Sequence, residues 1–383
     1  DSIRLFAYPG EKPIISRGEP YVYPGYPTEL VVISGDYISV KKLDVSGNTQ
    51  KETGIWGGIR AYFLTNSTFD RIDIHHNGGG MQLTNTDKCV VINSDFHHNQ
   101  DPLTTSAGAY GNADGMGIDW LEASSLGITD PIKIAQYNQQ SQDAVNYIIS
   151  CRFWYNTDDG IDDWEYEGNL YIDNCWAFWN GFIPDTWNKG GDGNGFKLGR
   201  TSISAPNVVK TRVYNSIAFQ NKKWGFLDNG ARCNMEIYNN TAYQNAYKGL
   251  DSWAGGFNFT TTPEAIKYFI KNNIAYANGN DVDVKDVTNI NHNTWDLPVT
   301  VTDADFKSVS TLGVDGARQS NGLLPELNFL HLAESSDLRL AGVDVGLPFG
   351  GTNPDLGAYQ YYVKPTGTVV QGTKTIVIKG ATI

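Results

Sequence analysis

Carboxylates crowd into one short stretch of the chain. Asp158, Asp159 and Asp162 lie within five residues of one another, around a single glycine, in the segment Asn156-Thr-Asp-Asp-Gly-Ile-Asp162. Like charges this close repel one another unless protons or a cation neutralise them. The cluster offers only oxygen ligands, which suit a hard cation such as calcium better than zinc or copper. The stretch therefore predicts a metal site.

A seven-residue pattern recurs along the middle of the chain. Each copy is a short β-type run that opens with Asn or Ser and ends in Asn, as in 93–99, 150–156, 174–180, 215–221, 239–245 and 272–278. The most closely spaced turns of the pattern lie 22 to 24 residues apart. Coils of this length, made of strands and Asn/Gly turns without a helical period, predict an all-β fold, a right-handed parallel β-helix.

The Asn that ends each copy should stack on the Asn of the next coil. Its amide would satisfy buried backbone groups of the turn, which predicts an asparagine ladder. Cys151 and Cys175 fall in the same column of the repeat, which favours stacked core residues over a redox pair. The His-His pairs at 75–76 and 97–98 recur at the coil period, so stacked turn histidines are favoured over a metal site.

A second column follows each Asn and begins with glycine, in Gly80-Met-Gln, Gly115-Met-Gly, Gly160-Ile-Asp, Gly195-Phe-Lys, Gly225-Phe-Leu and Gly249-Leu-Asp. Because strand side chains alternate, the apolar residue should point inward and the next residue outward. Asp162 and Lys197 should then be outward neighbours on consecutive coils, about 4.8 Å apart. The residue before each glycine forms its own column, which brings Asp114 next to Asp159 and Asn194.

This register gathers Asp114, Asp158, Asp159 and Asp162 on one outward patch, with Lys197 one coil further on. Four carboxylates could supply part of the six to eight oxygens that calcium takes. A nearby cation disfavours the ammonium form of a lysine. A neutral lysine beside a metal-bound substrate carboxylate suits removal of the proton alpha to that carboxylate, which in a uronic acid is on C5. Loss of the C4 leaving group would then cut the glycosidic bond by β-elimination.

At these residues the sequence resembles polysaccharide lyase family nine, pectin-cleaving enzymes built on a parallel β-helix. The resemblance rests on the segments Gly111-Asn-Ala-Asp-Gly115, Asn156–Asp162 and Gly193-Asn-Gly-Phe-Lys-Leu-Gly199, and it extends over about residues 30–290. It implies an acidic pectic polysaccharide as the substrate and Ca²⁺ as the cofactor. It also implies roles for five residues: a Brønsted base at Lys197 and calcium ligands at Asp114, Asp158, Asp159 and Asp162.

Two features favour rhamnogalacturonan I over polygalacturonate, which stays the alternative substrate. The stretch Leu121–Asn146 is longer than expected of a polygalacturonate-cleaving member, and aromatic segments follow at 164–166 and 176–187. Aromatic walls suit apolar sugar faces such as the rhamnose methyl groups. Further candidates for binding the substrate, with plain surface residues as the alternative, are Lys189, Arg200 and Arg232.

Two other functions are compatible with the same residues. Asn156-Thr-Asp-Asp159 partly matches polygalacturonase-type hydrolases of the same fold, but a Gly-His-Gly and an Arg-Ile-Lys motif are absent. Inverting hydrolysis also needs two carboxyls about 6.5–9.5 Å apart, which adjacent aspartates do not obviously supply. The other function is a carbohydrate-binding or adhesive β-helix with structural calcium. Gly190-Gly-Asp-Gly193 is interpreted as a loop, because a calcium-binding turn of this kind recurs in arrays.

The composition limits the partners and the compartment. The 383 residues include 41 Gly and 21 Tyr and carry a net charge of −13, which predicts a turn-rich β protein and argues against nucleic acid as a partner. No apolar run is long enough to cross a membrane. The chain opens at Asp1, which predicts a mature or trimmed segment. The few Lys and many Asn, Tyr and Thr favour a secreted, periplasmic or cell-surface protein. We expect a monomer.

The repeat decays after about residue 280, and three parts are predicted. Residues 1–300 should form the β-helix with the catalytic site. Residues 301–362 should form a C-terminal cap packed on the end of the helix, which a solenoid needs. Residues 363–383, rich in Thr and Val, should form a terminal hairpin or a linker.

Overall fold

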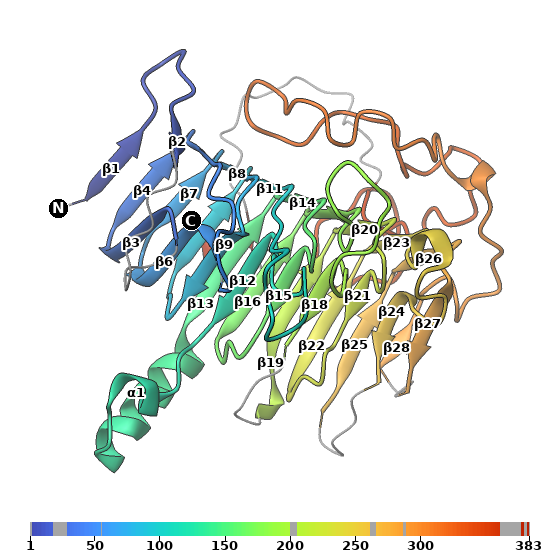
Figure 1. The fold of residues 1–383 in the computed structure, drawn as a ribbon. Helices are drawn as coiled ribbons and strands as arrows, with labels where there is room; N and C mark the ends of the chain where they lie inside the picture. The colour runs from blue at the N-terminus through green and yellow to red at the C-terminus, as the bar shows by residue number, and fades with distance from the viewer. Residues whose placement is uncertain are drawn as a thin grey trace.

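A computed structural model describes residues 2–17, 29–54, 56–199, 205–260, 266–285, 289–360, 377–378 and 381–382. Within these residues the chain winds into a parallel β-helix, in which successive coils add strands to three long sheets (Figure 1). The predicted right-handed parallel β-helix is confirmed. Among the described residues, no helix has the length and apolar composition needed to cross a membrane.

The described strands stack in chain order within each sheet. The first sheet contains β1 (Ile3–Phe6), β4 (Ile38–Lys41), β7 (Thr68–Asp70), β10 (Cys89–Ile92), β13 (Val145–Ile149), β16 (Asn169–Asp173), β19 (Ala205–Tyr214), β22 (Cys233–Tyr238), β25 (Tyr268–Lys271) and β28 (Ile290–Asn291). The second contains β2 (Ile14–Ser16), β5 (Asp44–Ser46), β8 (Asp73–His75), β11 (Asp95–His97), β14 (Arg152–Trp154), β17 (Trp176–Phe178), β20 (Ile217–Phe219), β23 (Thr241–Tyr243) and β26 (Ile274–Tyr276). The third contains β3 (Val31–Asp36), β6 (Gly57–Thr65), β9 (Gly79–Thr84), β12 (Met116–Asp119), β15 (Ile161–Asp163), β18 (Phe196–Leu198), β21 (Phe226–Leu227), β24 (Gly255–Phe259) and β27 (Asn280–Val284).

The interior of the coil is filled by apolar side chains stacked one coil upon the next. The rings of Phe196, Phe226 and Phe257 stack with centroids 4.9 Å apart, which matches the spacing of about 4.8 Å between neighbouring strands. Cys151 and Cys175 are buried free thiols, and the Cys151 amide contacts Cys175 Sγ at 3.4 Å. The predicted stacking of these cysteines in one core column is confirmed.

The asparagine ladder runs along the turns between the second and third sheets. Each Nδ2 donates to Oδ1 of the next rung at 2.8 to 3.0 Å, through Asn99, Asn156, Asn180, Asn221, Asn245 and Asn278. The same amides also donate to backbone carbonyls, as Asn180 does to Phe153 O at 3.0 Å. The predicted ladder is confirmed, and it holds the coils in register by satisfying buried polar groups.

The predicted glycine column of the third sheet is confirmed from Gly80 to Gly225. The prediction of Gly249 as its last member was wrong. Phe226 pairs with Phe257, so the column continues at Gly256 and not at Gly249. Gly249 instead ends a short 3₁₀ helix, η2 (Tyr247–Gly249), in a loop over residues 246–254. A loop inserted at a turn changes the residue count of a coil without changing its strand register.

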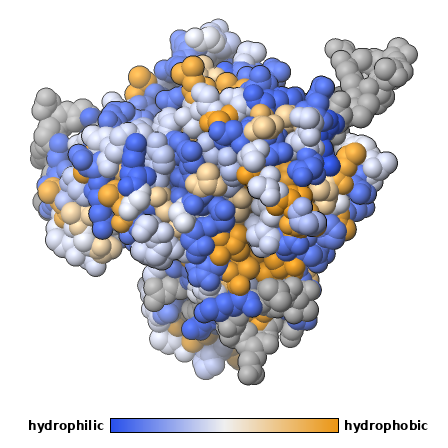
Figure 2. Space-filling view, turned by 90° about the vertical axis from the view of Figure 1, so that its right-hand side faces the viewer, coloured by the Kyte–Doolittle hydropathy of each residue, from blue (hydrophilic) through white to orange (hydrophobic). Residues whose placement is uncertain are grey.

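Residues 301–360 differ from the expected end cap, because they lie along the outer face of the second sheet. Phe306, Phe329 and Leu338 pack there with Phe219 in one apolar cluster, and the segment, which includes η3 (Asp303–Asp305), runs past β8 to β20 in Figure 1. Figure 2 looks at the end of the molecule where β26 to β28 lie and shows apolar residues gathered among hydrophilic ones. The segment therefore covers a flank of the coil.

The division at residues 300 and 362 stays a prediction. Within the tail predicted as a hairpin or linker, β29 (Val377–Ile378) and β30 (Ala381–Thr382) pair antiparallel. The rest of residues 363–383 lies outside the described residues.

A helical insertion occupies the stretch 121–146, whose length was noted in the sequence without a prediction of its structure. It contains η1 (Ala123–Leu126) and α1 (Pro131–Asp143), and α1 projects from the coil in Figure 1. The helix begins here because the Asp130 side chain accepts hydrogen bonds from the Ile132 and Lys133 amides at 2.9 and 3.0 Å, with proline in the first turn. Tyr137 anchors it by donating to Leu121 O at 2.7 Å.

Two rows of histidines stack at the end of the second sheet, as predicted. The ring centroids of His75 and His97 lie 4.8 Å apart, and those of His76 and His98 lie 5.1 Å apart. Burial, followed by the charge of His97, lowers the pKa of His98 to about 4, although a bond to Asp185 opposes the shift. His98 is thus held neutral in the folded chain.

We expect Asn180→Ala to lower the free energy of unfolding by about 2–4 kcal/mol, because it leaves the buried amides of neighbouring rungs without partners. Asn180 Oδ1 accepts from both the backbone and side-chain nitrogens of Asn156, at 3.2 and 3.0 Å. Denaturant unfolding followed by circular dichroism measures the change. The exposed Asn188 is the matched control, and an equal loss in Asn188→Ala would contradict a special role for the ladder.

The His98 pKa predicts a loss of stability in acid. Since the folded pKa of about 4 lies below the unfolded value of about 6.5, the unfolded chain binds more protons between these values. Stability from this group is complete above about pH 6.5 and falls as the pH drops towards 4. Between the two ends of this window, we expect the free energy of unfolding to fall by about 1–3 kcal/mol less in His98→Gln than in the wild type. Unfolding midpoints measured at both pH values give the two losses. Equal losses would show that His98 does not contribute.

Candidate active site

A cleft of about 830 Å³ lies on the outer face of the third sheet. Its lining includes Asp114, Asp158, Asp162 and Lys197, which come from three successive coils. Asp159 is fully buried beside them. The structure therefore brings together all five residues that the sequence analysis assigned to the chemistry.

The coil register places these residues as predicted. Asp162 and Lys197 are direct partners in the pairing of β15 with β18. The Asp159 amide donates to Asp114 Oδ1 at 3.0 Å, and the Asn194 amide donates to Asp159 Oδ1 at 2.6 Å. The column Asp114, Asp159 and Asn194 is thus held by hydrogen bonds from each coil to the one before it.

Lys197 is buried among the carboxylates. Its Nζ lies 2.8 Å from Asp162 Oδ2 and 3.0 Å from Asp159 Oδ2, and 5.6 Å from the ring centroid of Trp164. Burial alone would lower the pKa of Lys197, but the charges of Asp159 and Asp162 outweigh it, so the pKa lies above its usual value. Lys197 is therefore an ammonium group when only these carboxylates surround it.

Burial and the mutual repulsion of the carboxylates together outweigh the charge of Lys197. Burial, followed by the charge of Asp158, raises the pKa of Asp114 well above its usual value, and burial followed by the charge of Asp159 does the same for Asp158. The pKa of Asp162 rises to about 6, because burial and the charge of Asp159 exceed the opposing effect of Lys197. Such a cluster gains stability from any further positive charge that binds to it.

Asp192 also belongs to this cluster, although the sequence analysis interpreted its segment as a loop. Carboxylate oxygens of Asp158, Asp159 and Asp192 lie within 4.8 Å of one another, as do those of Asp114, Asp159 and Asp162. Gly191 allows this approach, since a Cβ there would lie 2.7 Å from Asp158 Oδ1. Asp192 could have been predicted as a member of the cluster from its position between the repeat copy 174–180 and the Gly195-Phe-Lys member of the glycine column.

Asp163 is acidic and adjacent to the cluster but does not join it. It points to the inside of the coil, where it is 1% exposed. Burial, followed by the charge of Asp162, raises the pKa of Asp163 well above its usual value, which favours the protonated carboxyl. The alternation of β15 thus separates two neighbouring carboxyls into an outer ligand candidate and an inner core residue.

The cluster fits a hard cation such as calcium. Its donors are all oxygens, and Asp162 Oδ1 is buried without a hydrogen-bond partner among the described residues. Five carboxylates face two ammonium groups, those of Lys197 and Lys223, which pair with Asp162 and Asp192. An oxygen-rich site with excess negative charge is what calcium requires.

The remaining predicted residues have mixed positions. Lys189 lines the cleft. Arg232 is exposed and is not among the residues that line it. Arg200 lies outside the described residues.

The prediction that aromatic residues of 164–166 and 176–187 form walls of the binding site is mostly wrong. Trp164 lines the cleft, but Tyr166 and Trp176 are buried, with 2% and 1% of their surfaces exposed. No residue of 121–146 contributes to the lining that the structure describes. The insertion projects away with α1 instead, so of the two features that favoured rhamnogalacturonan only Trp164 of the aromatic segments lines the cleft.

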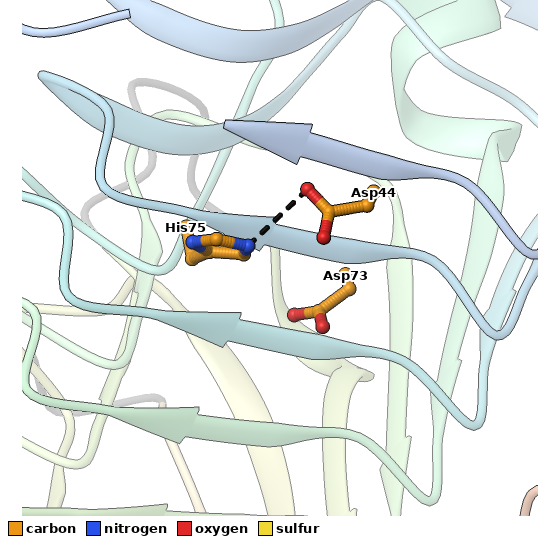
Figure 3. Close-up of side chains that lie close together, drawn as sticks. All are labelled: Asp44, Asp73 and His75. Carbon is orange, nitrogen blue, oxygen red and sulfur yellow. Dashed lines mark ion pairs between the residues drawn. The ribbon is translucent and has the colours of Figure 1, made fainter. Parts of the chain in front are cut away.

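Figure 3 shows another acidic group, on the second sheet rather than in the cleft. Asp44 and Asp73 lie on neighbouring strands and face His75, whose Nε2 is 3.2 Å from Asp44 Oδ1. This group lines no part of the cleft described above.

Several cleft residues outside the metal cluster were not predicted from the sequence. Arg60 and Gln82 continue the outward column of Asp162 and Lys197 towards the N-terminal coils. Lys223 and Trp253 line the opposite end. The column position could have identified Arg60 and Gln82, whereas Lys223 and Trp253 lie in turns.

Comparison with known proteins places the chain in a family. Residues 1–293 match the family model described as "Pel9A-like, right handed beta helix region". The chain is 30% identical over 335 residues to pectate lyase L of Dickeya dadantii, covering 86% of this chain and 68% of that protein. It is 27% identical over 361 residues to a pectate lyase of Emericella nidulans, covering 83% and 79% of the two chains.

Two solved structures share the fold. The crystal structure of pectate lyase Pel9A superposes with a TM-score of 0.70 at 26% identity, covering 94% of this chain and 80% of that one. A rhamnogalacturonan lyase gives a TM-score of 0.66 at 24% identity, covering 87% and 79%, which supports the fold alone. The chain therefore belongs to the Pel9A-like right-handed β-helix family of polysaccharide lyases.

Proposed function

We propose that the protein is a calcium-dependent lyase that cleaves a galacturonate-containing pectin backbone by β-elimination. One observation carries the proposal: Lys197 lies within 3.0 Å of two carboxylates of an oxygen-only cluster at the floor of the cleft. Asp114, Asp158, Asp159 and Asp162 are the proposed calcium ligands, and Asp192 is a further candidate. Lys197 is the proposed base.

In the proposed reaction, neutral Lys197 takes the proton from C5 of a galacturonate unit. The C–H electron pair forms the C4=C5 double bond, the C4–O bond breaks, and the leaving oxygen takes a proton from solvent. The products are a fragment with a new reducing end and a fragment that begins with a 4,5-unsaturated uronate. Bound calcium would supply positive charge twice, by offsetting the carboxylates that keep Lys197 protonated and by facing the substrate carboxylate where negative charge develops.

Polygalacturonate is the first candidate backbone, because the relatives that carry the family assignment are pectate lyases. Rhamnogalacturonan I was favoured by the sequence analysis and stays the second candidate. The insertion and most of the aromatic residues that favoured it do not line the cleft, although exposed Trp164 and Trp253 there suit apolar sugar faces. Initial rates on the two polymers distinguish the candidates.

We also propose that the protein acts as a secreted, periplasmic or cell-surface monomer. All proposed ligands and the base come from one chain. A polymeric substrate of this size is met outside the cytoplasm. A hydrolase or a binding protein with structural calcium is the alternative class.

Lys197→Ala should lower kcat by about 10²–10⁴-fold, the usual contribution of a positioned base. The assay follows the ultraviolet absorbance of the unsaturated uronate on polygalacturonate with calcium. Lys248→Ala, an exposed lysine outside the cleft lining, is the control and should retain the wild-type rate. New reducing ends without this absorbance would instead identify a hydrolase.

Removal of calcium should abolish the absorbance change, and added calcium should restore it. Because Asp158 supplies one of the charges that attract the cation, Asp158→Asn should raise the calcium concentration for half-maximal activity by roughly tenfold or more. Calcium titrations of the rate measure both effects. Full activity in excess chelator would exclude the proposed role of the cluster, and sugar binding without any product would favour a binding protein.

A further inference from the structure

A lysine and a tryptophan stand together in the cleft wall beyond Lys197. Lys223 lies in the turn before β21, and Trp253 lies in the loop 246–254 that precedes β24. Both line the same cleft as Lys197, and Lys223 Nζ is 5.8 Å from the ring centroid of Trp253. The coil containing Lys223 is the next after that of Lys197, since β18 pairs with β21.

Trp253 is unusual because its large apolar side chain is 62% exposed inside a cleft. Its ring rests edge-on against the buried Trp224, with centroids 6.2 Å apart. A supported, exposed indole face offers apolar area at little cost in side-chain freedom, and such faces fix ligand rings in binding sites. The C–H face of a sugar ring is a ligand of this kind.

Lys223 supplies a positive charge beside that face. Its Nζ lies 2.5 Å from Asp192 Oδ1, and the side chains of Lys223 and Asp192 are 19% and 52% exposed. The neighbouring Lys222 differs, because its side chain is 1% exposed and pairs with Asp251 at 3.0 Å. Of these two neighbouring lysines, which both line the cleft, Lys223 is therefore the one whose ammonium group a ligand over Trp253 can reach.

We propose that Lys223 and Trp253 form a subsite for a second galacturonate unit, next to the unit whose C5 faces Lys197. Trp253 stacks on the sugar ring, and Lys223 binds its carboxylate as a compact charge. The pair thereby favours backbones whose carboxyl groups are free over those whose carboxyls are methyl esters. This inference rests on the proposed function, because it assigns a second sugar to the same cleft.

The test measures binding without turnover, in full-length Lys197→Ala protein with saturating calcium. Calorimetric titrations use an oligogalacturonate long enough to span several coils and the same oligosaccharide as its methyl ester. Lys223→Ala should weaken binding of the free acid by about tenfold or more and leave the ester unaffected. Trp253→Ala should weaken both ligands by a similar factor.

The chain offers a matched control for the lysine. Lys248 Nζ lies 4.8 Å from the ring centroid of Trp187, a similar pair that does not line the cleft. Lys248→Ala should leave binding of both ligands unchanged. Lys223→Arg should restore part of the affinity for the free acid, and Trp253→Phe should retain most of the affinity for both ligands.

Three results would overturn the subsite: no loss in Lys223→Ala, an equal loss for acid and ester, or a loss that follows weaker calcium binding in the same variant. The last result would mean that Lys223 only positions Asp192. The proposed function fails separately, if the protein with Lys197 intact binds the oligosaccharide in this lysine-dependent way but forms no unsaturated product.

Discussion

The parallel register of the coils is the constraint on which the whole site depends. Strand pairing sets a separation of about 4.8 Å between coils, and the buried amides of the asparagine ladder hold each turn to the next. Asp114 and Asp159 are 45 positions apart in the chain yet hydrogen-bonded, and Asp162 meets Lys197 across one pairing. A shift of the strand pairing by one residue would point Asp162 into the core and Asp163 into the cleft. The carboxylate cluster would then be lost.

The same register explains how much the sequence could reveal. Residues in the repeat obey two local rules, alternation along the strand and identity of position between coils. The columns of Asp114, Asp159, Asp162 and Lys197 followed from those rules and are found in the structure. The asparagine, cysteine and histidine stacks followed in the same way, because each requires only that like positions superpose.

The features that could not be predicted from the sequence lie in loops whose length differs from one coil to the next, and in the segment 301–360. The loop 246–254 displaced the glycine column to Gly256 and brought Trp253 into the cleft. The Gly190–Gly193 segment turned Asp192 onto the cluster. The position of segment 301–360 is fixed by its apolar contacts with the second sheet. Loop conformations depend on such distant packing, which no periodic pattern encodes.

The proposed mechanism requires that one cation and Lys197 act on the same uronate at this cluster. A crystal structure of Lys197→Ala with calcium and a galacturonate trisaccharide would test this requirement. We expect calcium held by carboxylates of Asp114, Asp158, Asp159 and Asp162, with C5 of one sugar about 3 Å from the position that Lys197 Nζ takes in the intact protein. Calcium bound at another carboxylate group, such as Asp44 and Asp73, or a sugar whose C5 faces away from that position, would disprove the mechanism.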